Sequence, residues 1–248
     1  WDENKQHPYF TDVSKIAGIN KSGYGLGVNI TDINHDGWKD ILVSNDYLSG
    51  DQLWINNGDG TFSERSKEYF KHTSFSAMGN DVTDINNDGL PDIIELDMSP
   101  ADNYRRKLMM SPNNYQNVLS FERFNYQYQY GHNTLQLNCG NALGENDSIK
   151  KPVFSDIAYF SGIDRTDWSW APLVADFDND SYRDIIITNG FPKDLSDQDF
   201  IAFRNKLSSV ASDDMLIEQM PAAKLKNYAF SNNHNLTFSD VTEAWGIK

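Results

Sequence analysis

The chain of 248 residues has one cysteine, little positive charge and no long apolar run. A single cysteine, Cys139, excludes an internal disulfide and a zinc site built from thiolates. Only 21 lysines and arginines stand against 36 aspartates and glutamates, so the basic face that nucleic acid requires is missing. No apolar stretch approaches the roughly 18–20 residues of a membrane-spanning helix, so we expect no such segment in this chain.

Catalytic motifs are also missing. The five histidines show neither His-x-His nor HExxH spacing, so a catalytic zinc site is not expected. The nucleophile pattern Gly-x-Ser-x-Gly does not occur, and nothing marks a particular pair of carboxylates for glycoside hydrolysis. We therefore interpret the chain as non-catalytic.

A repeat is what the sequence does contain. Residues 25–40, 77–92 and 169–184 align without gaps, and each segment carries an acidic loop followed by a short β-branched run. Each repeat continues with an element that ends in Asn-Asn-Gly or a variant of it, and then with Phe-x-[Asp/Glu]. A fourth copy of this last element stands alone at residues 10–12.

Each repeat predicts four short strands, and four-stranded units repeated at this scale are typical of β-propeller blades. We therefore predict an all-β fold, a propeller segment of about three blades plus a leading outer strand, with partly helical insertions. Because closed propellers usually have four to eight blades, we expect further blades elsewhere in a larger protein. The predicted parts are an outer strand at 1–20, blades at 21–70, 71–160 and 161–248, an insertion at 99–132 and a helical insertion at 192–226.

The acidic loops follow the pattern Asp-x-[Asn/Asp]-x-Asp-[Gly/Ser]-x-x-Asp. Calcium takes six to eight oxygen ligands, which such a loop can supply from side chains at positions 1, 3, 5 and 9 and from the carbonyl at position 7. We predict three calcium sites. Their ligands are Asp32, Asn34, Asp36, the Trp38 carbonyl and Asp40; Asp84, Asn86, Asp88, the Leu90 carbonyl and Asp92; and Asp176, Asp178, Asp180, the Tyr182 carbonyl and Asp184.

Other interpretations of these loops are weaker. The second loop also fits an EF-hand with Glu95 at position 12, but the equivalent residues are Val43 and Ile187, which cannot bind calcium. Magnesium is disfavoured because it retains several waters. Solvated turns rich in Asp and Asn are the remaining alternative.

The loops resemble the calcium loops of FG-GAP/VCBS repeats, and more closely the long ASPIC/UnbV-type FG-GAP surface proteins, many of them from Bacteroidota. The departures are Ser181 in place of Gly, Cys139 in place of Asn and the long 140–152 loop. The resemblance implies a propeller, calcium and an exported or outer-membrane-surface setting, but no established reaction. The matching segments are residues 79–92, 102–107, 133–138, 166–170, 217–221 and 227–230.

Four further patterns carry expectations. Gly27, Gly79 and Ala171 occupy equivalent positions where neighbouring blades crowd together. Residues 102–107 are expected to form salt bridges with the acidic surface, with an anion site as the alternative. Three tyrosines alternate at residues 126–130; we expect them to pack against a blade, with a sugar-stacking platform as the alternative. Val28, Ile30, Val82 and Val174 are expected on inner strands.

The resulting hypothesis is a calcium-stabilised binding module of a surface protein. Its partner would be a surface-protein complex, such as a SusC/SusD-like outer-membrane uptake system, or a glycan. The alternative is a calcium-dependent polysaccharide-degrading enzyme, a lyase or hydrolase, because some polysaccharide lyases are calcium-bearing propellers.

Overall fold

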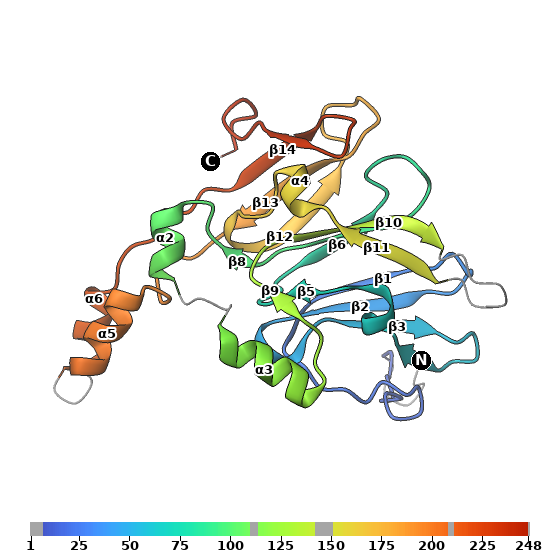
Figure 1. Cartoon of the computed structure of the whole chain (residues 1–248), viewed down its shortest axis with the longest axis horizontal. Helices are drawn as coiled ribbons and strands as arrows, with labels where there is room; N and C mark the ends of the chain where they lie inside the picture. Colours follow the sequence, from blue (N-terminus) through green and yellow to red (C-terminus); the bar gives the residue numbers. More distant parts are fainter. Residues whose placement is uncertain (1–6, 110–113, 142–150, 208–210, 248) are drawn as a thin grey trace.

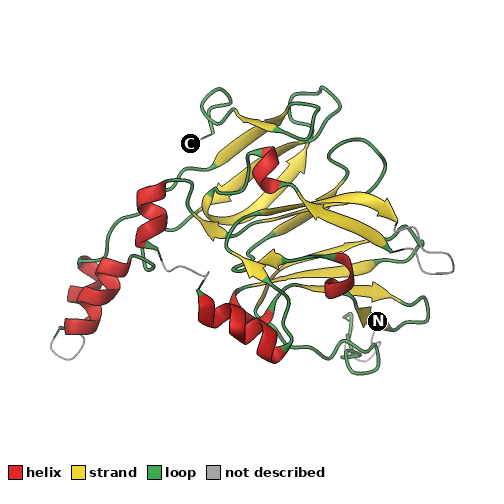
Figure 2. Cartoon of the chain, in the orientation of Figure 1, coloured by secondary structure: helices red, strands yellow, loops and turns green. Residues whose placement is uncertain are grey.

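The computed structural model describes residues 7–109, 114–141, 151–207 and 211–247. These residues form a mostly β structure in which three antiparallel sheets follow one another along the chain (Figures 1 and 2). Each sheet contains the four strands of one repeat, so the predicted division into four-stranded units is confirmed for the described residues.

The strands of each sheet lie in sequence order from the inner to the outer edge. The first sheet contains β1 (Gly25–Thr31), β2 (Asp40–Asn45), β3 (Gln52–Asn56) and β4 (Phe62–Glu64). The second contains β6 (Asn80–Thr83), β7 (Asp92–Glu95), β10 (Thr134–Asn141) and β11 (Pro152–Asp156). The third contains β12 (Asp167–Ala175), β13 (Asp184–Asn189), β14 (Tyr228–Asn232) and β15 (Phe238–Asp240), and β8 (Met98–Ser99) adds a fifth strand beside β12.

The inner strands β1, β6 and β12 are neighbours, and one apolar core fills each space between consecutive sheets. Leu42, Leu53, Ile93 and Phe154 belong to the core between the first and second sheets. The core between the second and third sheets includes Ile94, Leu135, Ile185, Ile187 and Phe230. Val28, Ile30, Val82 and Val174 lie on the inner strands, as predicted.

The predicted outer strand at residues 1–20 is not a strand in the part that the structure describes. Residues 8–13 belong to none of the strands of the described chain. The turn that follows nevertheless repeats the other copies. Asp12 accepts the N–H of Ser14, just as the acids that end β4, β11 and β15 accept the N–H two residues on.

These turns join consecutive sheets at their outer edges. Ala17 accepts the N–H of Phe62 in the first sheet (2.8 Å). After β11, the short helix α4 (Ala158–Ser161) brings the hydroxyl of Ser161 within 2.6 Å of the Leu236 carbonyl in the third sheet. After β4, the helix α1 (Ser66–Tyr69) lies against β11. In the three sheets, the Phe-x-[Asp/Glu] element is therefore a structural link as well as a strand.

The insertions carry the longer helices. The insertion at 99–132 contains α2 (Asn103–Leu108), α3 (Tyr115–Phe124) and β9 (Gln129–Tyr130), and β9 pairs in parallel with β5 (Thr73–Ser74). As predicted, the insertion at 192–226 is helical, with α5 (Gln198–Leu207) and α6 (Asp213–Glu218) projecting from the left of the sheets in Figure 1. A 3₁₀ turn, η1 (Tyr47–Ser49), follows β2.

Arg105 connects the two insertions to the third sheet. Its guanidinium donates Nε–H and Nη2–H to the two oxygens of Asp167 on β12 (2.7 and 3.0 Å), and Nη1 pairs with Asp194. The expectation of salt bridges for residues 102–107 is thereby confirmed. The same contacts occupy most of the Arg105 donors that an anion would need.

Equivalent small residues allow the inner strands to approach one another. A Cβ on Gly27 would lie 3.0 Å from the Met78 carbonyl oxygen, and a Cβ on Gly79 would lie 2.3 Å from that of Trp170. Because both contacts are to backbone atoms, they cannot be relieved by rotating a side chain. The predicted crowding at Gly27 and Gly79 is confirmed.

We expect Gly79→Ala to destabilise the protein by about 1–3 kcal/mol, because the added methyl group forces β6 and β12 apart. Urea unfolding measures the effect. Gly190→Ala is the matched control, since the nearest atom to its new Cβ, in Trp170, is 4.0 Å away. Equal stabilities of the two variants would show that the inner strands are not closely packed.

Candidate metal-binding loops

The three acidic loops share one hydrogen-bonding pattern. In the first loop, Asp32 accepts the backbone N–H groups of Asp36 (3.0 Å) and Gly37 (2.9 Å), and Asp36 accepts that of Trp38 (2.8 Å). The second and third loops repeat all three bonds from Asp84 and Asp88, and from Asp176 and Asp180. The carboxylates at positions 1 and 5 therefore hold the loop in its turned conformation by accepting its backbone N–H groups.

The aspartate at position 9 is buried in every loop and joins two parts of its sheet. Oδ2 of Asp40 accepts the N–H of Ile33 in the loop, and Oδ1 accepts the N–H of Asn56 at the end of β3 (2.9 Å each). Asp92 and Asp184 form the same pairs of bonds, with distances of 2.8–3.0 Å. These three side chains fix each loop against the neighbouring hairpin.

The asparagine that ends the third strand completes this arrangement. The side-chain amide of Asn56 donates to the Lys39 carbonyl (3.1 Å), and its oxygen accepts the N–H of Gly58 in the hairpin turn (2.9 Å). Asn138 and Asn232 make the equivalent bonds in the other repeats. The recurring Asn of the sequence is therefore a connector between loop and hairpin.

The third loop departs from the other two in three ways. Ser181, at position 6, has φ of +76°, in the region that Gly37 and Gly89 occupy without strain. Asp178 replaces the amide side chains of Asn34 and Asn86, which donate to the acid at position 5. His234 instead contacts that acid, with Nε2 2.5 Å from Asp180 Oδ2.

The donor set fits a hard divalent cation. Carboxylate oxygens of Asp176, Asp178 and Asp184 lie within 4.8 Å of one another. Burial and then the charges of Asp184 and Asp180 raise the pKa of Asp178, as expected for carboxylates that face each other without a counter-charge. Carbonyl, amide and carboxylate oxygens are the ligands that calcium prefers, so the predicted residues of each loop form a chemically suitable group.

The loops form one continuous edge. Asn87 of the second loop donates to the Ser181 carbonyl of the third (3.0 Å), and Arg183 donates to the Asp84 carbonyl (2.7 Å). A small cavity lined by Asn34, His35 and Leu90 separates the first loop from the second. The candidate sites are therefore adjacent rather than scattered over the surface.

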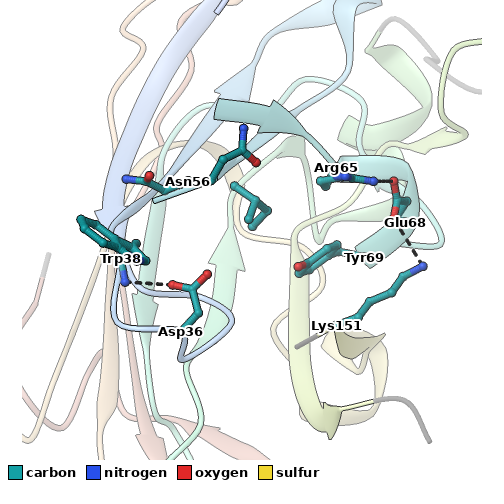
Figure 3. Close-up of a pocket in the computed structure, with 9 residues that line it drawn as sticks. Asp36, Trp38, Asn56, Arg65, Glu68, Tyr69 and Lys151 are labelled. Atoms are coloured by element: carbon teal, nitrogen blue, oxygen red, sulfur yellow. Dashed lines mark hydrogen bonds and ion pairs between the residues drawn. The ribbon is translucent and has the colours of Figure 1, made fainter. Parts of the chain in front are cut away.

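A larger cavity of about 550 Å³ opens beside the first loop (Figure 3). Asp36 and Trp38 line one side, and an ion-pair chain of Arg65, Glu68 and Lys151 lines the other, with distances of 2.6 and 3.4 Å. The first loop is consequently accessible to solvent from this side.

The alternating tyrosines are not packed against a blade, contrary to expectation. Tyr126, Tyr128 and Tyr130 are 43–46 % exposed, while Gln129 between them is buried. The intervening glutamines turn inward, and the side-chain amide of Gln127 donates to the Phe70 carbonyl (2.7 Å). The three phenol rings remain partly exposed, although Tyr130 also contacts the ring of His72 (centroid distance 5.1 Å), and we call them the tyrosine row.

Sequence patterns missed one cluster of possible metal ligands. His72, His132 and Asp156 lie together, although the two histidines are far apart in the chain. Motif searches rely on short spacings, and this cluster is assembled from three separate segments, two of which lie beside each other through the pairing of β5 with β9. The acid of the Phe-x-[Asp/Glu] element was the one part visible in the sequence.

The described residues define a mostly β repeat protein in which an Asp-rich loop follows the inner strand of each sheet. Residues 32–94 match the family model of an FG-GAP-like repeat. The match runs from the first aspartate of the first loop into the second strand of the next repeat, so it covers one full period. A comparison with curated proteins gives no match.

Burial raises the pKa of Asp40, and likewise that of Asp92, to about 6. Between pH 4 and 6, the native metal-free state therefore binds more protons at these two groups than the unfolded chain does. The free energy of unfolding consequently falls as the pH rises through that window. Each of the two aspartates contributes at most about 1.4 kcal/mol per pH unit to this change in the free energy of unfolding.

We expect the pH dependence of urea unfolding, measured in chelator, to be shallower between pH 4 and 6 in Asp40→Asn than in the unsubstituted protein. The amide cannot titrate, although the variant is less stable because it loses an acceptor. Comparing the slopes rather than the stabilities isolates the titration, and parallel slopes would show that Asp40 titrates normally.

Proposed function

We propose that this chain is a calcium-binding β-propeller segment of a larger cell-surface protein, acting as a non-catalytic binding module. The observation that carries the proposal is the threefold recurrence of one acidic loop, with the same hydrogen bonds, on adjacent sheets. The FG-GAP-like match over residues 32–94 supports a binding role.

The propeller is inferred from the first sheet. Ile30, Val82 and Val174 are equivalent, since each pairs with the residue that follows the position-9 aspartate. Val82 and Val174 pack into the cores shared with the preceding sheet. Ile30 is 63 % exposed, and Leu26 and Val28 on the same strand are 53 % and 66 % exposed. A further blade packed against β1 would cover this apolar face.

Calcium is inferred from charge and ligand type. Each loop gathers three or four carboxylates, which repel one another strongly at short range unless a cation neutralises them. In each loop the side chains at positions 1, 3, 5 and 9 and the position-7 carbonyl would hold the ion. The ion would supply structural cross-linking between the loop and the hairpin.

We propose an extracellular or outer-membrane-surface location, following the resemblance to FG-GAP surface proteins. Within the described ranges, no helix has both the length and the apolar character that crossing a membrane requires. The partner that we favour is a glycan, because the tyrosine row offers exposed aromatic faces. A surface-protein complex of the SusC/SusD type is the alternative partner.

We expect chelator to lower the melting temperature and calcium to restore it better than equimolar magnesium. Binding to the native state alone stabilises by about 2.7 kcal/mol per site at a hundredfold excess over Kd. For a chain of this size, that corresponds to roughly 5–10 °C per site. Differential scanning calorimetry gives the result, and a melting curve unchanged by chelator would eliminate structural calcium.

Asp178→Asn tests the third site separately. The strained Ser181 costs roughly 1–2 kcal/mol, and the additional carboxylate of Asp178 compensates for it. Calorimetric titration should therefore show one site weakened about tenfold and two unchanged. The double variant with Ser181→Gly should recover most of the loss. Equal weakening of all three sites would contradict this assignment.

For the glycan proposal, we expect Tyr126→Ala and Tyr128→Ala each to weaken binding in a glycan array at least about threefold, because ring stacking is lost. Tyr104→Ala is the control, since Tyr104 is exposed but lies on α2, outside the row. Intact glycans after incubation support a binding module, whereas shortened products would favour the lyase or hydrolase alternative. Unchanged binding in both variants would exclude the row as the contact surface.

A further inference from the structure

Two imidazoles converge on one carboxylate oxygen at the outer edge of the second sheet. Nε2 of His72 and Nε2 of His132 each lie 2.9 Å from Oδ2 of Asp156. The three candidate ligand atoms are all within 4.8 Å of one another. The side chains of His132 and Asp156 are 5 % exposed, and that of His72 is 22 % exposed. The cluster is therefore largely buried, with one imidazole reachable from solvent.

Three separate segments build this cluster. His72 directly precedes β5, and His132 comes two residues after the end of β9. The parallel pairing of Thr73 with Gln129 and of Ser74 with Tyr130 places the two segments side by side, and the chain turns directly after β9, where the His132 N–H donates to the Tyr130 carbonyl (2.9 Å). Asp156 is the last residue of β11. Both imidazole rings also pack against tyrosines, with centroid distances of 5.1 Å from His72 to Tyr130 and 4.8 Å from His132 to Tyr159.

Asp156 is held in position independently of the histidines. Its Oδ1 accepts the backbone N–H groups of Leu135 (3.1 Å) and Ala158 (3.0 Å), which leaves Oδ2 facing the imidazoles. Burial acts to raise the pKa of Asp156, but the hydrogen bonds from His132, His72 and the backbone outweigh it and lower the pKa. The carboxylate is consequently ionised and preorganised.

The equivalent acids in the other repeats have simpler partners. Glu64 pairs with Lys21, and Asp240 pairs with Lys226 at 3.5 Å. One ammonium group is a sufficient counter-charge in both cases, but it cannot bind a metal ion while protonated. The second repeat instead places two imidazoles there, and imidazole is the commonest metal ligand among side chains.

We propose that His72, His132 and Asp156 form a zinc site that is separate from the acidic loops. Zinc binds imidazole nitrogen and carboxylate oxygen at about 2.0–2.2 Å in tetrahedral geometry, which requires ligand atoms roughly 3.3 Å apart. The two nitrogen–oxygen separations of 2.9 Å need to widen by a few tenths of an ångström, and all three ligand atoms already lie within 4.8 Å of one another. Calcium and magnesium prefer oxygen-only sites, so the two nitrogens select against the ion proposed for the loops.

The site would have three protein ligands and a fourth position toward the exposed side of His72. Zinc sites that keep one position for water or another small ligand have this composition, whereas closed structural sites use four protein ligands. The bound zinc would also tie β9 and β11 to the segment before β5, and so fasten the insertion to the second sheet.

The test uses the whole chain, saturated with calcium so that the acidic loops are filled, at a pH where histidine is neutral. Zinc is titrated by calorimetry, and cobalt is titrated by visible absorption as a spectroscopic substitute. We expect one zinc ion per chain and displacement of the ¹⁵N resonances of two imidazole Nε2 atoms. His72→Gln and His132→Gln should each weaken binding at least about 100-fold, more than the loss of an outer hydrogen bond.

His7→Gln is the matched control, because His7 is exposed and its ring is hydrogen-bonded to the neighbouring Pro8 carbonyl (2.7 Å), away from the cluster. It should bind zinc as the unsubstituted protein does. Unchanged zinc affinity in His72→Gln would overturn the proposal, and so would a titration in which the imidazole resonances respond to pH but not to zinc. The resonance measurement is made on the unsubstituted protein, so it decides the question even if a variant fails to fold.

Discussion

The structure depends most on one buried carboxylate in each repeat, that of Asp40, Asp92 or Asp184. One oxygen of each holds the acidic loop and the other holds the end of the third strand, so a single side chain sets the distance between them. Burying an ionised group without partners is very unfavourable, and two backbone N–H donors meet part of that cost. For Asp40 and Asp92, the rest of the cost is expressed as a raised pKa of the carboxyl group.

The same constraint accounts for the features around the loops. Because the position-9 aspartate fixes where the loop ends, the backbone turns back sharply, and positive φ values recur at positions 4 and 6. Asn56 and its equivalents then bind the hairpin to the segment that the aspartate has positioned. Ser181 shows that this geometry is imposed by the loop, since it adopts φ of +76° without the freedom of glycine.

Sequence reasoning succeeded where the determinants were local and repeated. The three sheets, the loops and the crowding at Gly79 follow from short patterns that recur in register. It failed where a partner from elsewhere in the chain decides the structure. Residues 8–13 include a copy of the Phe-x-[Asp/Glu] element but belong to no strand of the described chain, and β8 joins the third sheet although it follows the second repeat's β7. The tyrosine row was misjudged because the buried side of the segment is polar, with Gln129 rather than an aromatic ring inside.

The cluster of His72, His132 and Asp156 shows how insertions add chemistry to a repeat. The acid is a repeat residue, held by the same kind of turn as Glu64 and Asp240, so its position does not depend on the insertion. The insertion supplies His132, and β9 within it aligns the segment that carries His72. A ligand set can therefore arise from a preorganised carboxylate and two added side chains, while the repeat itself remains unchanged. The proposed calcium loops use the opposite arrangement, in which all ligands come from one short segment.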